Sequence, residues 1–182
     1  MATSPFGLLA MTLIHIPNKM NKLIKYLPFL ILLISLDQIS KTYLISYLKT
    51  QAHFILEITP FLDFVYAWNY GVSFGLFKQY YQYSNYALLA LNSLIVIYLG
   101  NMLLKSESKL SIWGLNFIIG GAIGNLVDRG IRGAVFDFIY FNYEDLAFPA
   151  FNLADSFITI GAVIFIYDYL FGNKSKQIPE KN

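Results

Sequence analysis

Two aspartates that lie in strongly apolar stretches are the chemically most informative residues of this chain. Asp137 lies in the segment 135–141, VFDFIYF, and Asp155 ends the segment 151–155, FNLAD. Ionised side chains are costly in or near lipid, so where they occur they usually face a protein interior or a functional site. No basic residue lies within one helical turn of Asp155, which indicates that its partner comes from elsewhere in the chain.

A pair of carboxyl groups could perform proteolysis if the fold holds them a few ångströms apart. One member then keeps its proton while the other stays charged. The charged member can deprotonate a water while the protonated member polarises a carbonyl, which is the chemistry of aspartic proteases. Asp128, Asp137 and Asp155 are all candidates. Arg129 follows Asp128 and should keep it ionised, so the sequence favours Asp137 with Asp155 and leaves Asp128 open.

The composition is that of a membrane protein. Of the 182 residues, 57% are hydrophobic and 13% are charged, whereas soluble domains average about 25% charged residues. The net charge of +2 comes without a basic recognition motif, so nucleic acid is not an expected partner. The chain lacks cysteine, and His15 and His53 lie far apart. We therefore expect no thiolate or zinc site and no cofactor.

Four segments have the length of transmembrane helices, which need about 20 apolar residues. They are 23–47, 86–104, 110 to about 128, and 151–171. Lysines concentrate before the first segment, between the second and third, and after the fourth. Positive charge favours the cytoplasmic side, so both termini are expected there, with the connections 48–85 and 129–150 facing outward.

The first outward connection contains two predicted strands, 54–58 and 61–66, which are rich in aromatic and β-branched residues. The expected architecture is an all-α membrane protein with four transmembrane helices and a small extracytoplasmic β-strand cradle. We expect one domain at 21–173 and a cytoplasmic tail at 174–182. Residues 1–20 fit neither a span nor a signal peptide, so they are interpreted as a disordered extension or a mis-assigned start.

The predicted topology brings the embedded polar residues to one depth, near the outer surface. The first and third segments run outward and the fourth runs inward, so their outer ends meet. Polar residues three or four apart share one helical face and can point to one site. The pairs are Asp37 with Lys41, Asn125 with Asp128, and Asn152 with Asp155, while Asp137 lies in the connection between the last two segments.

Several of these features also have a purely structural explanation. Asp37 and Lys41 can form an ion pair that neutralises itself, and Asp128 with Arg129 can form a salt bridge at a helix end. The segment 69–75 could be a turn after a strand. Small residues spaced along one helix favour close packing over phosphate binding, and here they are Gly120, Gly121 and Gly124.

Five motifs resemble those of one known family, lipoprotein signal peptidase, also called signal peptidase II. They are DQISK, NYGVSFG, GGAIGNLVDR, VFDF and FPAFNLAD, and they begin at residues 37, 69, 120, 135 and 148. Each motif alone is weak, but all five occur in the family's order, and the resemblance covers residues 22–172.

The resemblance implies a membrane aspartyl endopeptidase of the bacterial cytoplasmic (inner) membrane, with its active site near the outer face. Such an enzyme removes the signal peptide from diacylglyceryl-modified prolipoproteins by cleaving before the lipidated cysteine. The implied partners are lipid-modified prolipoproteins and membrane lipids, and we expect a monomer. The family is also the target of the cyclic peptide globomycin.

The resemblance assigns the catalytic pair to Asp137 and Asp155. Phe136 and Phe148 depart from the family pattern, as does Val72-Ser73, and these departures are expected to alter the shape of the pocket only. The residues implied to line or support the site are Asp37, Lys41, Asn69, Gly71, Asn125, Asp128, Arg129, Asn152 and Ala154.

Three other functions remain to be weighed. A proton-coupled small membrane transporter would place its ionisable groups near the midplane, between repeated helix bundles, and the chain shows neither feature. A magnesium-dependent lipid transferase would gather carboxylates around substrate phosphates. A structural scaffold would leave Asp155 without an explanation.

Overall fold

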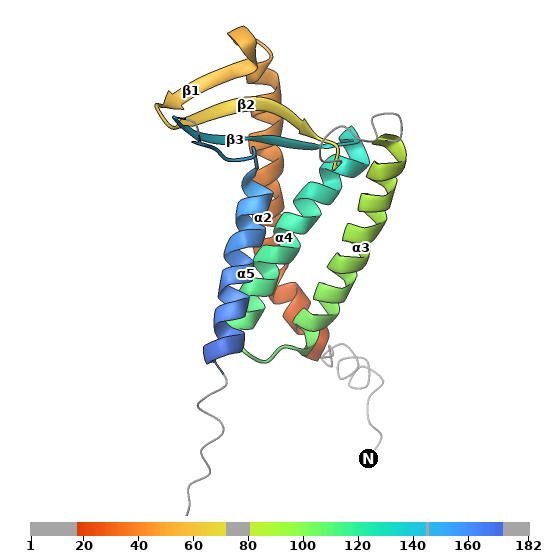
Figure 1. The fold of residues 1–182 in the computed structure, drawn as a ribbon. Helices are drawn as coiled ribbons and strands as arrows, with labels where there is room; N and C mark the ends of the chain where they lie inside the picture. Colours follow the sequence, from red (N-terminus) through yellow and green to blue (C-terminus); the bar gives the residue numbers. More distant parts are fainter. Residues whose placement is uncertain (1–17, 72–80, 145, 173–182) are drawn as a thin grey trace, which may run out of the picture.

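Four long helices and a small sheet make up the computed structural model, which describes residues 18–71, 81–144 and 146–172. The sheet lies across one end of the helical bundle (Figure 1). All four helices are long and apolar enough to cross a membrane. The helices are α2 (Asn18–Leu48), α3 (Tyr81–Lys105), α4 (Lys109–Arg132) and α5 (Leu153–Phe171), and the strands are β1 (Ile55–Thr59), β2 (Leu62–Asn69), β3 (Val135–Tyr143) and β4 (Leu146–Ala147), with a short turn of 3-10 helix at Ala52–Phe54.

The helices match the four predicted spans, with shifted ends. Helix α2 already begins at Asn18, within the expected extension 1–20. Residues 1–17 and the expected tail 174–182 lie outside the described residues. Helix α4 continues past the expected end at Asp128 as far as Arg132. Gly133 then adopts a φ of 78°, the left-handed conformation that commonly ends a helix. Arg132 therefore lies one turn beyond Asp128 on the same helix.

Helix α4 contacts each of the other three helices, and its glycines explain how closely they approach. A Cβ atom at Gly121 would lie 2.3 Å from the carbonyl oxygen of Ala154 in α5, and one at Gly120 would lie 2.8 Å from Leu33 in α2. The packing role predicted for these glycines is thus confirmed. Close backbones allow short polar side chains on different helices to reach one another.

Apolar side chains cover the outer surfaces of the helices. Among the exposed ones, Leu94 and Ile97 lie on α3, and Val163 and Ile166 lie on α5. In water such a surface would be a liability, but lipid solvates it. The chain is therefore a multi-pass membrane protein.

The sheet is antiparallel, with the strand order β1-β2-β3-β4. Strands β1 and β2 confirm the two strands predicted from the sequence, and the four helices with a small sheet match the expected architecture. Strand β3, which carries Asp137, was expected only as part of the second outward connection. The first residues of β3 are buried whichever way they point, and the alternation typical of a half-buried strand is absent. The sheet packs on the end of α2 through Leu44, Leu48, Phe136 and Phe138.

Candidate active site

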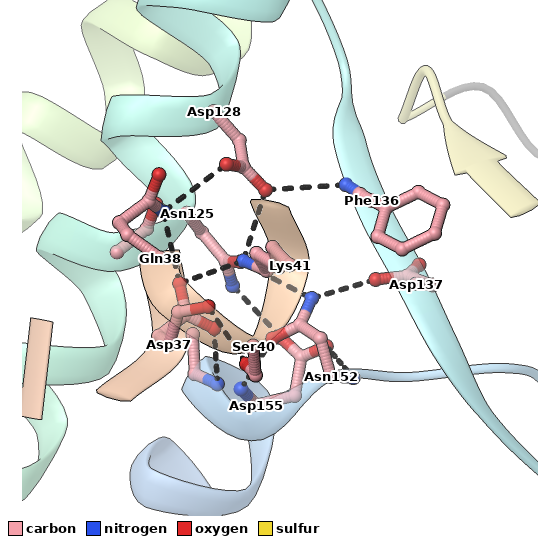
Figure 2. Close-up of polar contacts among 12 residues, drawn as sticks. Asp37, Gln38, Ser40, Lys41, Asn125, Asp128, Phe136, Asp137, Asn152 and Asp155 are labelled. Atoms are coloured by element: carbon pink, nitrogen blue, oxygen red, sulfur yellow. Dashed lines mark hydrogen bonds and ion pairs between the residues drawn. The ribbon is translucent and has the colours of Figure 1, made fainter. Parts of the chain in front are cut away.

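The polar residues singled out from the sequence meet at the end of the bundle that carries the sheet. Figure 2 shows side chains from α2, α4, β3 and α5 pointing toward one another. The predicted convergence is therefore confirmed. The residues brought together are Asp37 and Lys41 from α2, Asn125 and Asp128 from α4, Asp137 from β3, and Asn152 and Asp155 at the start of α5.

A buried ion cluster lies at the centre of this arrangement. The Nζ atom of Lys41 lies 2.9 Å from Oδ2 of Asp37 and 2.9 Å from Oδ2 of Asp128, and all three side chains are fully buried. The guanidinium of Arg132 pairs with the other oxygen of Asp128. Two acids and two bases thus give a cluster with no net charge, as a site away from water requires.

This cluster corrects two predictions. Asp37 and Lys41 do pair, but Lys41 also serves Asp128, so the pair does not neutralise itself in isolation. The cations of Asp128 are Lys41 and Arg132, and the expected salt bridge with Arg129 is not found among its ion pairs within the described residues. Because Arg129 and Asp128 are adjacent on a helix, their side chains point in different directions.

Gln38 is a member of the cluster that sequence reasoning missed. Its Nε2 atom lies 3.0 Å from Oδ2 of Asp37 and 3.1 Å from Oδ1 of Asp128, and its Oε1 accepts a hydrogen bond of 2.8 Å from Arg132. Its position inside the DQISK motif was the available signal. Adjacent residues on a helix point in different directions. The side chain of Gln38 is nevertheless long enough to reach the ion cluster from the edge of the helix face that carries Asp37.

Backbone groups attach the ion cluster to the elements that carry the two apolar-embedded acids. The amide of Phe136 in β3 donates to Oδ2 of Asp128 at 3.2 Å. The amide of Ala154, in the first turn of α5, donates to Oδ1 of Asp37 at 3.0 Å. Asp137 follows Phe136 and Asp155 follows Ala154, so the cluster fixes the backbone immediately before each acid.

Asn125 connects the ion cluster to Asp155. Its Oδ1 accepts a hydrogen bond of 3.1 Å from Lys41, and its Nδ2 donates one of 2.8 Å to Oδ1 of Asp155. The ammonium can only donate and a charged carboxylate can only accept, so the two partners determine which way the amide faces. Asn125 therefore presents a donor to Asp155 without adding charge.

Asn152 contacts both acids. Its Nδ2 donates to Oδ1 of Asp137 at 2.6 Å. It also caps α5: its Oδ1 accepts from the amide of Asp155 at 3.0 Å, while Oδ2 of Asp155 accepts from the amide of Asn152 at 3.2 Å. This reciprocal capping box fixes the Asp155 side chain at the positive end of the helix dipole, where a negative charge is favoured.

Asp137 is the acid that holds its proton more readily than usual. Its exposed fraction is 4%. Burial first, and then repulsion from Asp155, raises the pKa of Asp137 to about 6, although hydrogen bonds from Asn152 and Asn69 and the charge of Lys41 oppose the shift. Asp155, the partner that the sequence favoured for Asp137, is thus the carboxylate that acts electrostatically on it.

Asn69 and Gly71 place the end of β2 beside the acids. Ala67 is opposite Asp137 in the β2–β3 ladder, so Asn69 is a diagonal neighbour whose side chain reaches Asp137. The amide of Gly71 donates to Oδ1 of Asn69 at 2.8 Å. Gly71 has a φ of 75°, and a Cβ atom there would lie 2.0 Å from Leu88, so this position requires glycine. The rest of the NYGVSFG motif, 72–75, lies outside the described residues.

Arg129 is a further cation that interacts with the two acids. Its guanidinium interacts electrostatically with Asp137 and Asp155, and its backbone oxygen accepts a hydrogen bond of 3.1 Å from Asn85. Its Nε and Nη1 atoms are buried and have no hydrogen-bond partner among the described residues. When the two acids share a single proton, the pair carries one negative charge. The single positive charge of Arg129 balances it.

An apolar pocket adjoins Asp155. It has a volume of about 510 Å³, and Phe148, Phe151, Thr159 and Ile160 are among the residues that line it. The chain can therefore place an apolar group next to one of the acids. Phe148 and Phe151 pack edge to face at 5.9 Å, so the departure at Phe148 from the family pattern shapes this pocket.

Comparisons with known proteins show which proteins the chain resembles. The family model for signal peptidase (SPase) II matches residues 29–171. The lipoprotein signal peptidase of Rickettsia akari is 52% identical over 152 residues, which cover 84% of this chain and 76% of that protein, and the one of Rickettsia felis is 51% identical over the same shares. A bacterial membrane enzyme solved by the in meso method at 2.3 Å resolution aligns with a TM-score of 0.71 and 26% identity, over 87% of this chain and 94% of that one.

Proposed function

The chain belongs to the signal peptidase II family, and we propose that Asp137 and Asp155 are the carboxyl pair with which this membrane aspartic peptidase removes signal peptides from prolipoproteins. The observation that carries this assignment is the raised pKa of the buried Asp137, which arises partly from the charge of Asp155. A shared proton is what an acid pair needs to activate water and polarise a carbonyl together. Asp128, the other candidate, is already neutralised by two cations.

The contacts of each acid support a division of roles. Asp155 accepts hydrogen bonds from Asn125 and from the backbone of Asn152, which orient its carboxylate for the role of general base. Asp137 holds the proton and donates it toward the scissile carbonyl oxygen. The amide side chains of Asn125, Asn152 and Asn69 orient the two acids. Because these amides are uncharged and do not take up a proton, the shared proton stays on the acid pair.

The reaction cycle then balances within the pair. Asp155 takes a proton from a water, the remaining hydroxide attacks the scissile carbonyl carbon, and Asp137 gives its proton to the carbonyl oxygen. When the tetrahedral intermediate collapses, Asp137 recovers a proton from one hydroxyl group and Asp155 gives its proton to the leaving amine. The pair returns to one protonated and one charged carboxyl. The buried donors of Arg129 hold a substrate carbonyl during these steps.

The place of the site in the bundle suits a lipidated substrate. Strand β3 and the start of α5, which carry the two acids, lie at the sheet end of the bundle (Figure 1). A bond near the lipid headgroups can therefore meet the acids while acyl chains remain in the bilayer. The apolar pocket beside Asp155 receives an apolar part of the substrate. We propose that the sheet lies outside the cytoplasmic membrane and that both termini are cytoplasmic, because the described lysines Lys22, Lys25, Lys105 and Lys109 lie at the end of the bundle away from the sheet. The enzyme acts as a monomer whose single domain spans 21–173, cleaving before the diacylglyceryl cysteine.

Replacing each acid separately by its isosteric amide tests the assignment. Asp137→Asn and Asp155→Asn should each lower cleavage of a lipidated precursor by about 10³-fold or more, because each removes one of the two proton transfers. Gel mobility of the precursor with purified enzyme in detergent is the assay. The matched control is Asp63→Asn, which should remain active. Asp63 is a carboxylate of the same sheet, and it accepts a hydrogen bond from Asn142.

Two outcomes would contradict the assignment. Full cleavage by either amide variant would remove that residue from the pair. A dead Asp128→Asn alongside an active Asp137→Asn would reassign the pair to Asp128 and Asp155. The transporter alternative is not favoured, since the matched family and relatives are peptidases.

A further inference from the structure

A second polar site lies at the opposite end of the bundle from the acid pair, where α2 meets the turn between α3 and α4 (Figure 1). A pocket of about 630 Å³ opens there, and its lining includes Lys22, Lys25 and Lys105. Lys25 and Lys41 lie on the same helix, and at a rise of about 1.5 Å per residue they are about 24 Å apart. The pocket is therefore separate from the proteolytic chemistry.

Two of these lysines are held in place by local contacts. The ammonium group of Lys22 donates to the backbone oxygen of Ser106 in the α3–α4 turn, which uses one of its three N–H donors. The ammonium group of Lys25 lies 5.5 Å from the centre of the Tyr26 ring. Charges that are positioned in advance lose less entropy when they bind an anion.

The lining combines positive charge with an apolar floor. Glu107 also lines the pocket, so the three lysines and this glutamate give a net charge of two positive units at neutral pH. Tyr26 and Ile112 also line the pocket, and both are buried in the apolar core between the helices. A ligand that complements this surface carries a negative charge and an attached apolar body.

The pocket also lies at the depth of the lipid headgroups. Lys22, Lys105 and Ile112 are all close to the ends of predicted membrane spans. Tyr26 packs edge to face on Trp113 with ring centres 5.6 Å apart, and aromatic residues of these types favour the membrane interface. Basic pockets between helices at this depth can bind anionic lipid headgroups.

We propose that this pocket binds the phosphate headgroup of an anionic phospholipid, with the lysines on the phosphate and the start of the acyl chains along the apolar floor. A free phosphate matches the charges but leaves the apolar floor uncovered, so the lipid is the better ligand. The bound lipid joins α2 to the α3–α4 turn and so stabilises the end of the bundle distant from the acid pair.

Binding of lipid to the purified full-length chain tests the proposal, without any substrate and hence independently of the catalytic assignment. Dioleoyl phosphatidylglycerol and zwitterionic dioleoyl phosphatidylcholine are titrated separately and counted by native mass spectrometry. The variant Lys25→Gln with Lys105→Gln should lose about 25-fold in affinity for phosphatidylglycerol, at about fivefold for each surface lysine. Lys22 is left intact because its hydrogen bond to Ser106 joins two elements.

The matched control carries the same change in charge at exposed lysines outside the pocket. Lys49→Gln with Lys109→Gln should keep the wild-type preference for phosphatidylglycerol, and Lys25→Arg with Lys105→Arg should keep most of it. Glu107→Gln should bind about fivefold more tightly, because it removes the one negative charge of the lining.

Three results would overturn the proposal. The first is equal binding of the two lipids by the wild-type chain. The second is an equal loss of affinity in the pocket and control variants, which would show only a general effect of charge. The third is displacement of phosphatidylglycerol by glycerol 3-phosphate at similar concentrations, which would make the site one for free phosphate.

Discussion

Lys41→Met removes the cation that two buried carboxylates share while keeping most of the side chain's length. Lys41 lies 2.9 Å from Asp37 and 2.9 Å from Asp128, and all three side chains have no exposed area. Removing one partner from a buried ion pair typically costs about 3–5 kcal/mol, because the remaining charge is buried without compensation. For a protein of this size that loss lowers Tm by roughly 6–20 °C.

The cost should fall mainly on Asp37. Asp128 keeps Arg132, whereas Asp37 keeps only neutral donors, from Gln38 and the amide of Ala154, among the contacts described. The double variant Lys41→Met with Asp37→Asn should therefore recover about 2 kcal/mol or more, since it removes the uncompensated charge. Lys49→Met, which alters an exposed lysine just beyond the same helix, should change stability by less than about 0.5 kcal/mol.

Thermal unfolding in detergent micelles, followed by circular dichroism, measures these effects. The single variant should also cleave slowly, because Asn125 loses the donor that orients its amide toward Asp155. A Lys41→Met variant that unfolds within about 1 kcal/mol of wild type would refute the reasoning. So would a double variant that is less stable than the single one.

Two further predictions concern the residues around the acid pair. Asn152→Ala should lower kcat by about 10-fold or more and destabilise the chain by about 1–2 kcal/mol, because it removes the donor to Asp137 and the cap of α5; wild-type kcat and Tm would contradict this. Asp137→Asn should stabilise the fold at pH 7.5 but not at pH 3.5. The pKa of Asp137 in the folded state is raised from 3.8 to about 6, so between these two pH values the carboxyl group ionises in the unfolded state first. The free energy of unfolding of the wild-type chain therefore falls as the pH rises through this range, by about 3 kcal/mol in total. Chemical unfolding of both proteins at the two pH values measures this, and equal stability at pH 7.5 would count against it.

Much of the architecture could be predicted because lipid imposes simple rules. The four spans follow from length and apolarity, whereas the orientation indicated by the lysines stays a prediction. Antiparallel helices then necessarily bring Asp37, Asn125 and Asp155 to one end. The glycines of α4 were correctly assigned to packing, because small residues are what let membrane helices approach closely.

The features that were missed depend on contacts between distant segments. The first half of strand β3 is buried on both faces, so its sequence lacks the alternation that reveals a strand. The partner of Asp128 could not be predicted because α4 extends one turn further than expected, which places Arg132 rather than Arg129 beside it. Gln38 joins the cluster through the reach of its side chain, which spacing along a helix does not reveal.

The titration of Asp137 is the measurement that tests the shared proton most directly. Carboxyl carbons of ¹³C-labelled aspartate are followed by NMR against pH, and the Asp137 signal is identified by its loss in Asp137→Asn. The account predicts a midpoint near pH 6 in the wild-type chain, and a lower midpoint in Asp155→Asn, where the repulsion from Asp155 is gone. A wild-type midpoint near the ordinary value of about 4, unchanged in Asp155→Asn, would contradict it.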